Sequence, residues 1–355
     1  MSTLRQLAAT MGLVCMVGIA AGAGPASAGQ FDGVTVRFGT FGGKWRDIVD
    51  SYVAKAFEKE GGKIEYVLGQ PANNMAKLIA ARGQEPPFDL LETMDNFLPQ
   101  LAAGNFTEKL DLAQLPNLSE LDKSMYDSGK VRIWITEEGI VYNRKKFAEV
   151  GIPVPKRYLD LADPRLKNKV SLPDISAAGA IPAIVGMSYE GGGSEADIGP
   201  GLEIVKKIAP ASFWSSSSNL QTLLVNGDVW AAAAQAGNVQ RLRDKVDLGI
   251  GFPPVTQGKS GVLKQGYLVK IKGAKNTQAI EWIINQFLTK PMQIAVLTEG
   301  GQVPVHKGAL AELQANPEYS FLRLSAEDFA KMYSADFSKV NEAAYVQRWN
   351  RTIGR

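Results

Sequence analysis

Four residues that follow the first predicted strand are of types that can hold a small polar molecule. They are Thr40, Gly42, Gly43 and Trp45. The strand, residues 34–38, alternates apolar and polar side chains, and the segment 44–60 has one apolar face, so a strand gives way to a helix here. Free backbone amides at a helix N-terminus suit a carboxylate or phosphate group. The alternative is that the glycines only cap the helix and Trp45 packs in the core.

Thr93 and Asn96 occupy a similar position after the third predicted strand, residues 88–92. Ligands of open α/β sheets bind beyond the carboxyl ends of the strands, so we expect both side chains at the same cleft. The alternative is that they cap the helix predicted over residues 96–103.

The chain lacks the arrangements that covalent catalysis needs. Ser188 follows Gly186 and Met187 but lacks the closing glycine of a nucleophile elbow. The single histidine, His306, is expected in a surface turn far from Ser188, so no catalytic triad is predicted. A secreted hydrolase is therefore the disfavoured alternative to a binding protein that makes and breaks no bond.

Two pairs of acids, Asp89 with Glu92 and Glu137 with Glu138, have the composition of a glycosidase pair. Acids at strand ends are more often solvated or capping, and we expect that role for both pairs. The chain has one cysteine, no histidine cluster and no Asp-rich calcium loop, so no metal or other cofactor is predicted.

The N-terminal 28 residues have the pattern of a secretory signal peptide. Arg5 supplies the positive charge, residues 7–19 form an apolar stretch too short to span a membrane, and residues 26–28 read Ala-Ser-Ala, a cleavage site. The mature chain is expected to begin at Gly29 and to work in the periplasm. Since Cys15 lies in the removed segment, the mature protein would have no disulfide.

Length and charge narrow the class further. At 355 residues the chain is long enough for two lobes with separate cores. Its net charge of +3 is too small and dispersed to indicate nucleic acid or an anionic membrane as partner.

Strands and helices alternate along the chain, which predicts an α/β fold with mostly parallel sheets flanked by helices. Two separate strand-like segments, residues 131–135 and 139–142, precede a proline-rich connection. We expect a discontinuous first lobe over residues 29–133 and 265–320, and a second lobe over residues 134–264. The helices predicted over residues 321–355 are assigned to the second lobe.

The chain resembles the periplasmic solute-binding proteins of ABC importers, in the subgroup similar to spermidine/putrescine binders. The resemblance rests on segments that occur in the family's order: residues 38–45 (FGTFGGKW), 88–92 (FDLLE), 139–147 (GIVYNRKKF), 159–164 (LDLADP), 169–174 (KVSLPD), 226–229 (NGDV) and 272–276 (KGAKN). It implies two hinged lobes of the type II kind, a ligand in the cleft between them, and a membrane permease that recognises the closed form. A small-molecule ligand and a monomeric protein are expected.

The positions at which polyamine binders hold their ligand are changed here. In register with the family, its acids become Ile175 and Ala178, a cage tryptophan becomes Gln235, and a tryptophan and an aspartate become Lys264 and Gly266. A buried ammonium needs an opposite charge, so these changes argue against spermidine or putrescine, which remains the alternative ligand.

The remaining candidates describe a polar cleft with a positive end. They are Trp214, the hydroxyls of Ser215 to Ser218, Gln235, Lys264 and Tyr267, and they suit a carboxylate-bearing or neutral polar metabolite. Each also has a structural interpretation: Lys264 as a solvated strand residue, the serines as a loose turn and Trp214 as a core aromatic.

Overall fold

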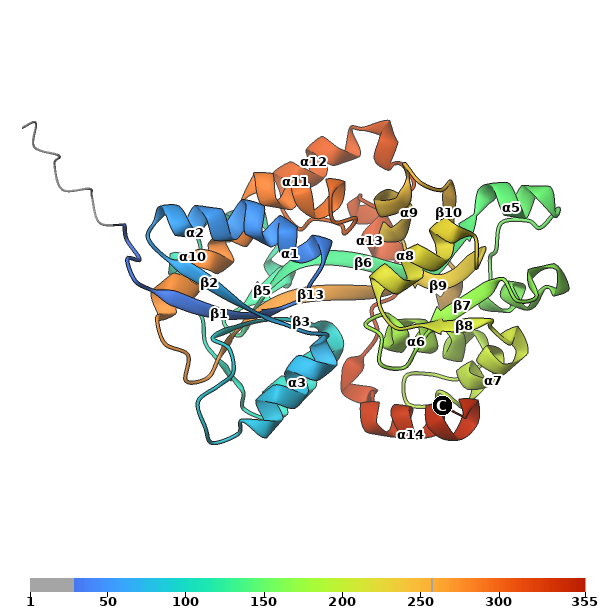
Figure 1. Cartoon of the computed structure of the whole chain (residues 1–355), viewed down its shortest axis with the longest axis horizontal. Helices are drawn as coiled ribbons and strands as arrows, with labels where there is room; N and C mark the ends of the chain where they lie inside the picture. Colours follow the sequence, from blue (N-terminus) through green and yellow to red (C-terminus); the bar gives the residue numbers. More distant parts are fainter. Residues whose placement is uncertain (1–28, 257, 355) are drawn as a thin grey trace, which may run out of the picture.

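The computed structural model describes residues 29–256 and 258–354, and it contains one large mixed sheet that passes through both halves of the molecule (Figure 1). The strand order along the sheet is β2-β1-β3-β13-β6-β9-β7-β8. Strand β1 pairs in parallel with β2 and β3, and β7 pairs in parallel with β8 and β9. The expected signal peptide, residues 1–28, lies outside the described residues.

The first half packs helices against β1, β2 and β3. Its large apolar core includes the fully buried rings of Phe38, Phe57 and Phe287. The predicted helix over 44–60 is present, with a π-helical turn, Asp50–Ala54, between its two parts. The elements of this half are β1 (Thr35–Thr40), α1 (Lys44–Val49), α2 (Lys55–Lys59), β2 (Lys63–Leu68), α3 (Pro71–Ala80), β3 (Leu90–Met94), α4 (Leu98–Ala103), β4 (Thr107–Glu108), β5 (Tyr126–Asp127), α10 (Thr277–Phe287), α11 (Lys290–Thr298) and α12 (Lys307–Gln314).

The second half has two further apolar clusters on opposite sides of its strands. One cluster contains Tyr158, Leu172 and Trp349, and the other contains Val141 and Leu220. The elements of this half are α5 (Arg144–Glu149), β7 (Val170–Pro173), α6 (Ala180–Glu190), α7 (Gly199–Ile208), β8 (Ser212–Trp214), α8 (Ser217–Asn226), β9 (Ala231–Gln235), α9 (Gly237–Leu242), β10 (Leu248–Gly251), β11 (Pro254–Thr256), β12 (Lys259–Ser260) and α14 (Glu342–Ile353). Helix α13 (Ala326–Lys331) precedes α14, and its Phe329 packs against the first core.

Two long antiparallel strands, β6 (Lys130–Asn143) and β13 (Val262–Ile271), run between the halves (Figure 1). The prediction of two separate strands over 131–135 and 139–142 was wrong. Glu137 and Glu138, which lie between the two predicted segments, are buried within the continuous strand β6 and lie opposite β13. The boundaries predicted at 133/134 and 264/265 fall inside β6 and β13.

The C-terminal segment contacts both cores. Leu322 and Leu324 are buried in the first core, whereas Tyr345 and Trp349 of α14 are buried in the second. Helix α14 packs along α7 (Figure 1). Across residues 29–256 and 258–354, the helices are all too short or too polar to cross a bilayer.

Candidate functional site

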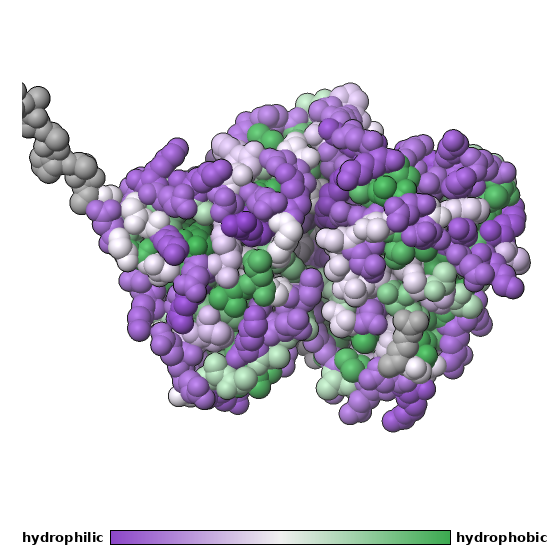
Figure 2. Space-filling model, viewed as in Figure 1, coloured by the Kyte–Doolittle hydropathy of each residue, from purple (hydrophilic) through white to green (hydrophobic). Residues whose placement is uncertain are grey.

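A cavity of about 260 Å³ lies between the two halves. Figure 2 shows the groove between them on one face of the molecule. The turn between β1 and α1 forms one wall, and the segment from Trp214 to Gln221 forms the other. Strands β6, β9 and β13, helix α9 and residues 70, 178–179, 299–300 and 302 also contribute to the lining.

The first wall begins at the end of β1, as the sequence predicted for Gly42, Gly43 and Trp45, which all line the cavity. Gly43 has φ of +64°, a conformation that glycine adopts readily, and it lets the chain turn directly from the strand into α1. Lys44 points to Glu299, with 2.8 Å between Nζ and Oε2, so its charge is already paired.

Trp45 is both a cavity residue and a core residue, so the two interpretations of its role are compatible. Its Nε1 donates to Oε2 of Glu92 at 2.7 Å, and Nε1 of Trp134 donates to Oε1 of the same carboxylate at 2.8 Å. Thr40 does not line the cavity, and its hydroxyl donates to Oε2 of Glu92 at 2.5 Å. Burial raises the pKa of Glu92 to about 7, and these three hydrogen bonds oppose the rise.

The second wall is the serine-rich turn that leads into α8. Trp214 is held by a 3.1 Å hydrogen bond from its Nε1 to the carbonyl of Ala233. Ser216 caps α8 by accepting from the backbone N–H of Asn219 at 3.2 Å. Of the predicted serines 215–218, Ser216, Ser217 and Ser218 line the cavity. Ser215 does not, and its backbone N–H donates to the Asn219 side chain.

Lys264 lies on the floor of the cavity and is buried, with 5% of its surface exposed. Its Nζ lies 2.8 Å from Oε1 of Gln235 and 3.4 Å from Oε1 of Glu138, which is fully buried. The interpretation of Lys264 as a solvated strand residue was therefore wrong. Burial lowers the pKa of Lys264 and raises the pKa of Glu138, while each charge opposes the shift of the other.

The expectation that the acidic pairs are solvated or capping was also wrong. Glu137 is buried and lies 3.1 Å from the guanidinium of Arg323. Asp89 is buried against Arg37 at 2.8 Å. Glu92, Glu137 and Glu138 lie on strands and Asp89 directly precedes β3, and each is met in its buried position by a cation or by hydrogen-bond donors from a distant segment.

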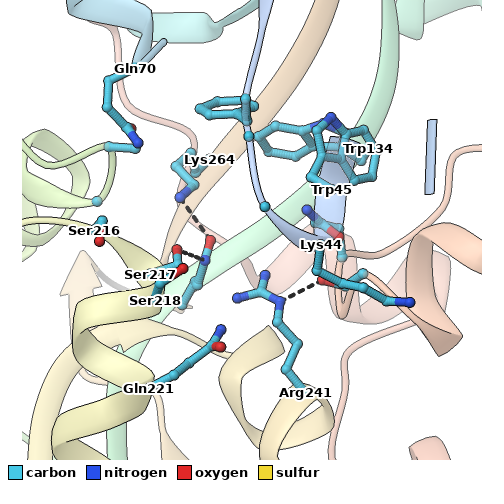
Figure 3. Close-up of a pocket in the computed structure, with 18 of the residues that line it drawn as sticks. Lys44, Trp45, Gln70, Trp134, Ser216, Ser217, Ser218, Gln221, Arg241 and Lys264 are labelled. Carbon is cyan, nitrogen blue, oxygen red and sulfur yellow. Dashed lines mark hydrogen bonds between the residues drawn. The ribbon is translucent and has the colours of Figure 1, made fainter. Parts of the chain in front are cut away.

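Arg241 was missed by the sequence reasoning. Its Nε donates to the carbonyl of Gly300 at 2.6 Å, and its Nη1 lies 3.4 Å from Oδ1 of Asn238, so the fork is held at the cavity (Figure 3). Within the described ranges it forms no ion pair with an acid. Burial lowers its pKa to about 10, and the charge of Glu138 opposes that shift. The sequence feature that could have indicated Arg241 as a cavity residue is its position six residues beyond the carboxyl end of β9.

Three other candidates lie outside the cavity lining. Asn96 donates from Nδ2 to Oε1 of Glu342 at 2.5 Å. Tyr267 accepts at its hydroxyl from Nη2 of Arg132 at 2.8 Å, and Thr93 is buried in β3. The structure therefore brings together Gly42, Gly43, Trp45, Trp214, Gln235 and Lys264, whose contact with ligand stays a prediction.

The expectation that His306 lies in a surface turn was wrong, because its side chain is buried. Its Nδ1 accepts from the backbone N–H of Ala309 at 3.2 Å and so caps α12. Ser188 is buried too, and its hydroxyl donates to the carbonyl of Ile184 at 2.7 Å. In the part of the chain that the structure describes, histidines and acids do not gather in groups of three or more suited to a metal ion.

Comparisons with known proteins identify the family. A profile of the bacterial extracellular solute-binding proteins matches residues 52–320. The putrescine-binding periplasmic protein SpuD of Pseudomonas aeruginosa is 25% identical over 86% of this chain and 89% of its own length. Spermidine/putrescine-binding periplasmic protein 1 of Haemophilus influenzae is 24% identical over 69% of each chain.

A solved structure with the same fold is that of MotA from Agrobacterium tumefaciens B6 in complex with glucopine. It superposes with a TM-score of 0.69 at 19% identity, over 90% of this chain and 98% of that one. The profile match covers most of the sequence, and the two-lobed fold agrees with it. The chain belongs to the bacterial extracellular solute-binding protein family.

Proposed function

We propose that this protein is the solute-binding component of an ABC importer, and that it captures a small carboxylate-bearing metabolite between its two lobes. The observation that carries the ligand class is Arg241, a cavity guanidinium with no acidic partner among the described residues. A planar guanidinium fork matches a carboxylate in geometry as well as in charge.

The two other cations of the cavity are already neutralised. Lys264 faces Glu138, and Lys44 faces Glu299. Arg241 therefore leaves one positive charge to be balanced, which favours an anionic ligand over a cationic one.

Capture would follow from the placement of these groups on different lobes. Trp45 belongs to the β1–α1 turn of the first lobe, whereas Arg241 and the Ser216–Ser218 turn belong to the second. A ligand that contacts both sets stabilises the closed form, which the permease would recognise. Export by the N-terminal segment, cleavage before Gly29 and action as a periplasmic monomer that leaves its ligand chemically unchanged belong to the same proposal.

A polyamine is the second candidate, because both curated relatives are named for putrescine or spermidine. The unneutralised charge of Arg241 in the cavity would repel a polycation, and the family's acidic positions hold Ile175 and Ala178 here. The carboxylate proposal is therefore preferred.

A thermal-shift screen of the mature chain separates the candidates. A ligand that binds only the folded state raises the melting temperature with concentration. We expect stabilisation by one or more small carboxylates, loss of the effect with the matching primary amides, and no effect of spermidine or putrescine. Stabilisation by polyamines alone would refute the ligand class, and a changed product after long incubation with a hit would refute a pure binding role.

A further inference from the structure

Three hydrogen-bond donors from three different elements converge on the carboxylate of Glu92. They are the hydroxyl of Thr40 from β1, the indole N–H of Trp45 from α1 and the indole N–H of Trp134 from β6, at 2.5, 2.7 and 2.8 Å. Glu92 is 1% exposed and does not itself line the cavity. Both tryptophans that it binds do line the cavity.

Each indole ring has a single N–H group, so a hydrogen bond to that group fixes which way the ring lies. Oε2 of Glu92 takes the N–H of Trp45 and Oε1 takes the N–H of Trp134, so one side chain orients two rings from separate elements. Figure 3 shows the two indoles together on the side of the cavity opposite the serine-rich turn. Gly266 on β13 leaves room for the ring of Trp134, because a methyl group there would overlap the indole.

We propose that Glu92 is a positioning residue that holds Trp45 and Trp134 as a fixed aromatic wall of the ligand cavity, and that this wall selects for a planar ring in the ligand. The inference rests on the proposed function, since it takes this cavity as the solute site. A pre-oriented wall loses little entropy when a ring stacks on it, so it favours flat ligands over puckered ones.

The role requires a group with two acceptor oxygens. A carboxylate accepts from both indoles at once, whereas an amide in the same place presents one oxygen and one NH₂ group. Whichever way the amide of a Glu92→Gln side chain is turned, one tryptophan N–H would face another donor. That ring must rotate or leave its place, because a buried unpaired donor is costly.

The acids on the neighbouring elements are each paired with a cation, so they do not replace Glu92 as acceptors for the two indole N–H groups. These pairs are Arg37 with Asp89, Lys44 with Glu299, Lys264 with Glu138 and Lys270 with Glu281. Asp95, on the same segment as Glu92, accepts from Gln265 at 3.2 Å. Burial raises the pKa of Glu92 and of Asp95 to about 7, so a comparison of variants is needed to separate their titrations.

The test without ligand uses the indole N–H signals of the six tryptophans in ¹⁵N NMR spectra of the mature protein. In Glu92→Gln we expect at least one of the signals of Trp45 and Trp134 to move strongly. In the wild type we expect both to titrate near pH 7, and in the variant this titration should disappear. Asp89→Asn is the matched control, a buried acid on the approach to the same strand that bonds Arg37 instead, and it should leave both signals in place.

The test with ligand compares phenylacetate with cyclohexylacetate, which differ in the flatness of the ring. We expect the wild type and Asp89→Asn to prefer phenylacetate, and Glu92→Gln to lose about tenfold of that preference while its fold is retained. Unmoved indole signals, or an unchanged preference in Glu92→Gln, would overturn the inference. Failure of the wild type to bind either acid would count against the carboxylate proposal instead, and the indole signals would still decide the role of Glu92.

Discussion

Replacing Arg241 by glutamine tests the electrostatic core of the proposed site. The guanidinium is anchored through Nε to the carbonyl of Gly300 and through Nη1 to Oδ1 of Asn238, which leaves Nη2 without a hydrogen bond to the described residues and so available to a ligand. Glutamine removes the positive charge and shortens the side chain, so a carboxylate would lose its only unneutralised partner in the described cavity. The neutral amide of the same ligand would lose much less.

Two independent arguments give the magnitude. A hydrogen bond to a charged group contributes about 1.5 to 3 kcal/mol net. A unit charge pair at about 4 Å contributes about 4 kcal/mol at the effective dielectric of a partly buried site. The two values lie on either side of about 3 kcal/mol, which is about a hundredfold in the dissociation constant. Arg241→Lys should lie between the wild type and Arg241→Gln, because it keeps the charge and loses the planar fork.

Isothermal titration calorimetry with a carboxylate found in the thermal-shift screen, and with its primary amide, measures the effect. Arg243→Gln is the matched control, because Arg243 adjoins the same helix, is exposed and pairs with Glu318 away from the cavity. We expect the carboxylate to bind Arg241→Gln about a hundredfold more weakly and the amide to change less than about threefold. Equal losses for acid and amide, or no loss for either, would refute the reasoning.

Three further changes test the packing and the buried charges. Lys264→Met should lower the free energy of unfolding in urea by about 3 to 5 kcal/mol, because it leaves the buried carboxylate of Glu138 unpaired. Adding Glu138→Gln to this variant should restore most of the lost stability. Wild-type stability of Lys264→Met alone would contradict this. The pKa of Glu92 is raised from 4.5 to about 7, so the stability it contributes is present below pH 4.5 and is lost as pH rises through 7. The difference in the free energy of unfolding between Glu92→Gln and the wild type should therefore change by up to about 3 kcal/mol in favour of the variant between pH 5 and pH 8. If the free energy of unfolding depends on pH in the same way in both proteins, the pKa of Glu92 is not raised. Gly237→Ala should lower the melting temperature and weaken ligand binding. A methyl group at this position would overlap the carbonyl of Gly301 and so displace α9 from the loop whose Gly300 carbonyl anchors Arg241. Wild-type affinity in this variant would show that the position of α9 does not affect ligand binding.

Local patterns predicted β1, the helix that follows it, β3 and α4, because their signals lie within short stretches of sequence. The alternation before Thr40 and the one-sided apolar pattern after Lys44 gave β1 and α1 with the correct junction. The failure was in β6, where Glu137 and Glu138 resemble a polar break. Their burial depends on Arg323 and Lys264, which are more than a hundred residues away in the sequence.

In the site too, features set by local sequence could be predicted, whereas features set by distant contacts could not. The wall that adjoins β1 could be predicted, because the end of a strand and the start of a helix are visible in the sequence. Trp134 could not, since it reaches the cavity only through the register that places Gly266 opposite it and leaves space for its ring. Arg241 was missed because its importance lies in lacking an acidic partner, a property that depends on every neighbouring element.

The charges of the cavity explain how a polyamine-like scaffold can suit an anion. Glu138 is a fully buried acid that does not line the cavity, and its charge is met by Lys264, which does line it. The same carboxylate opposes the loss of charge on Arg241, which would otherwise be favoured by burial. One buried acid thus supports two cations, and only one of those cations is neutralised by a close contact. A ligand with a single carboxylate completes the balance, whereas a polycation would add charge on the side that is already in excess.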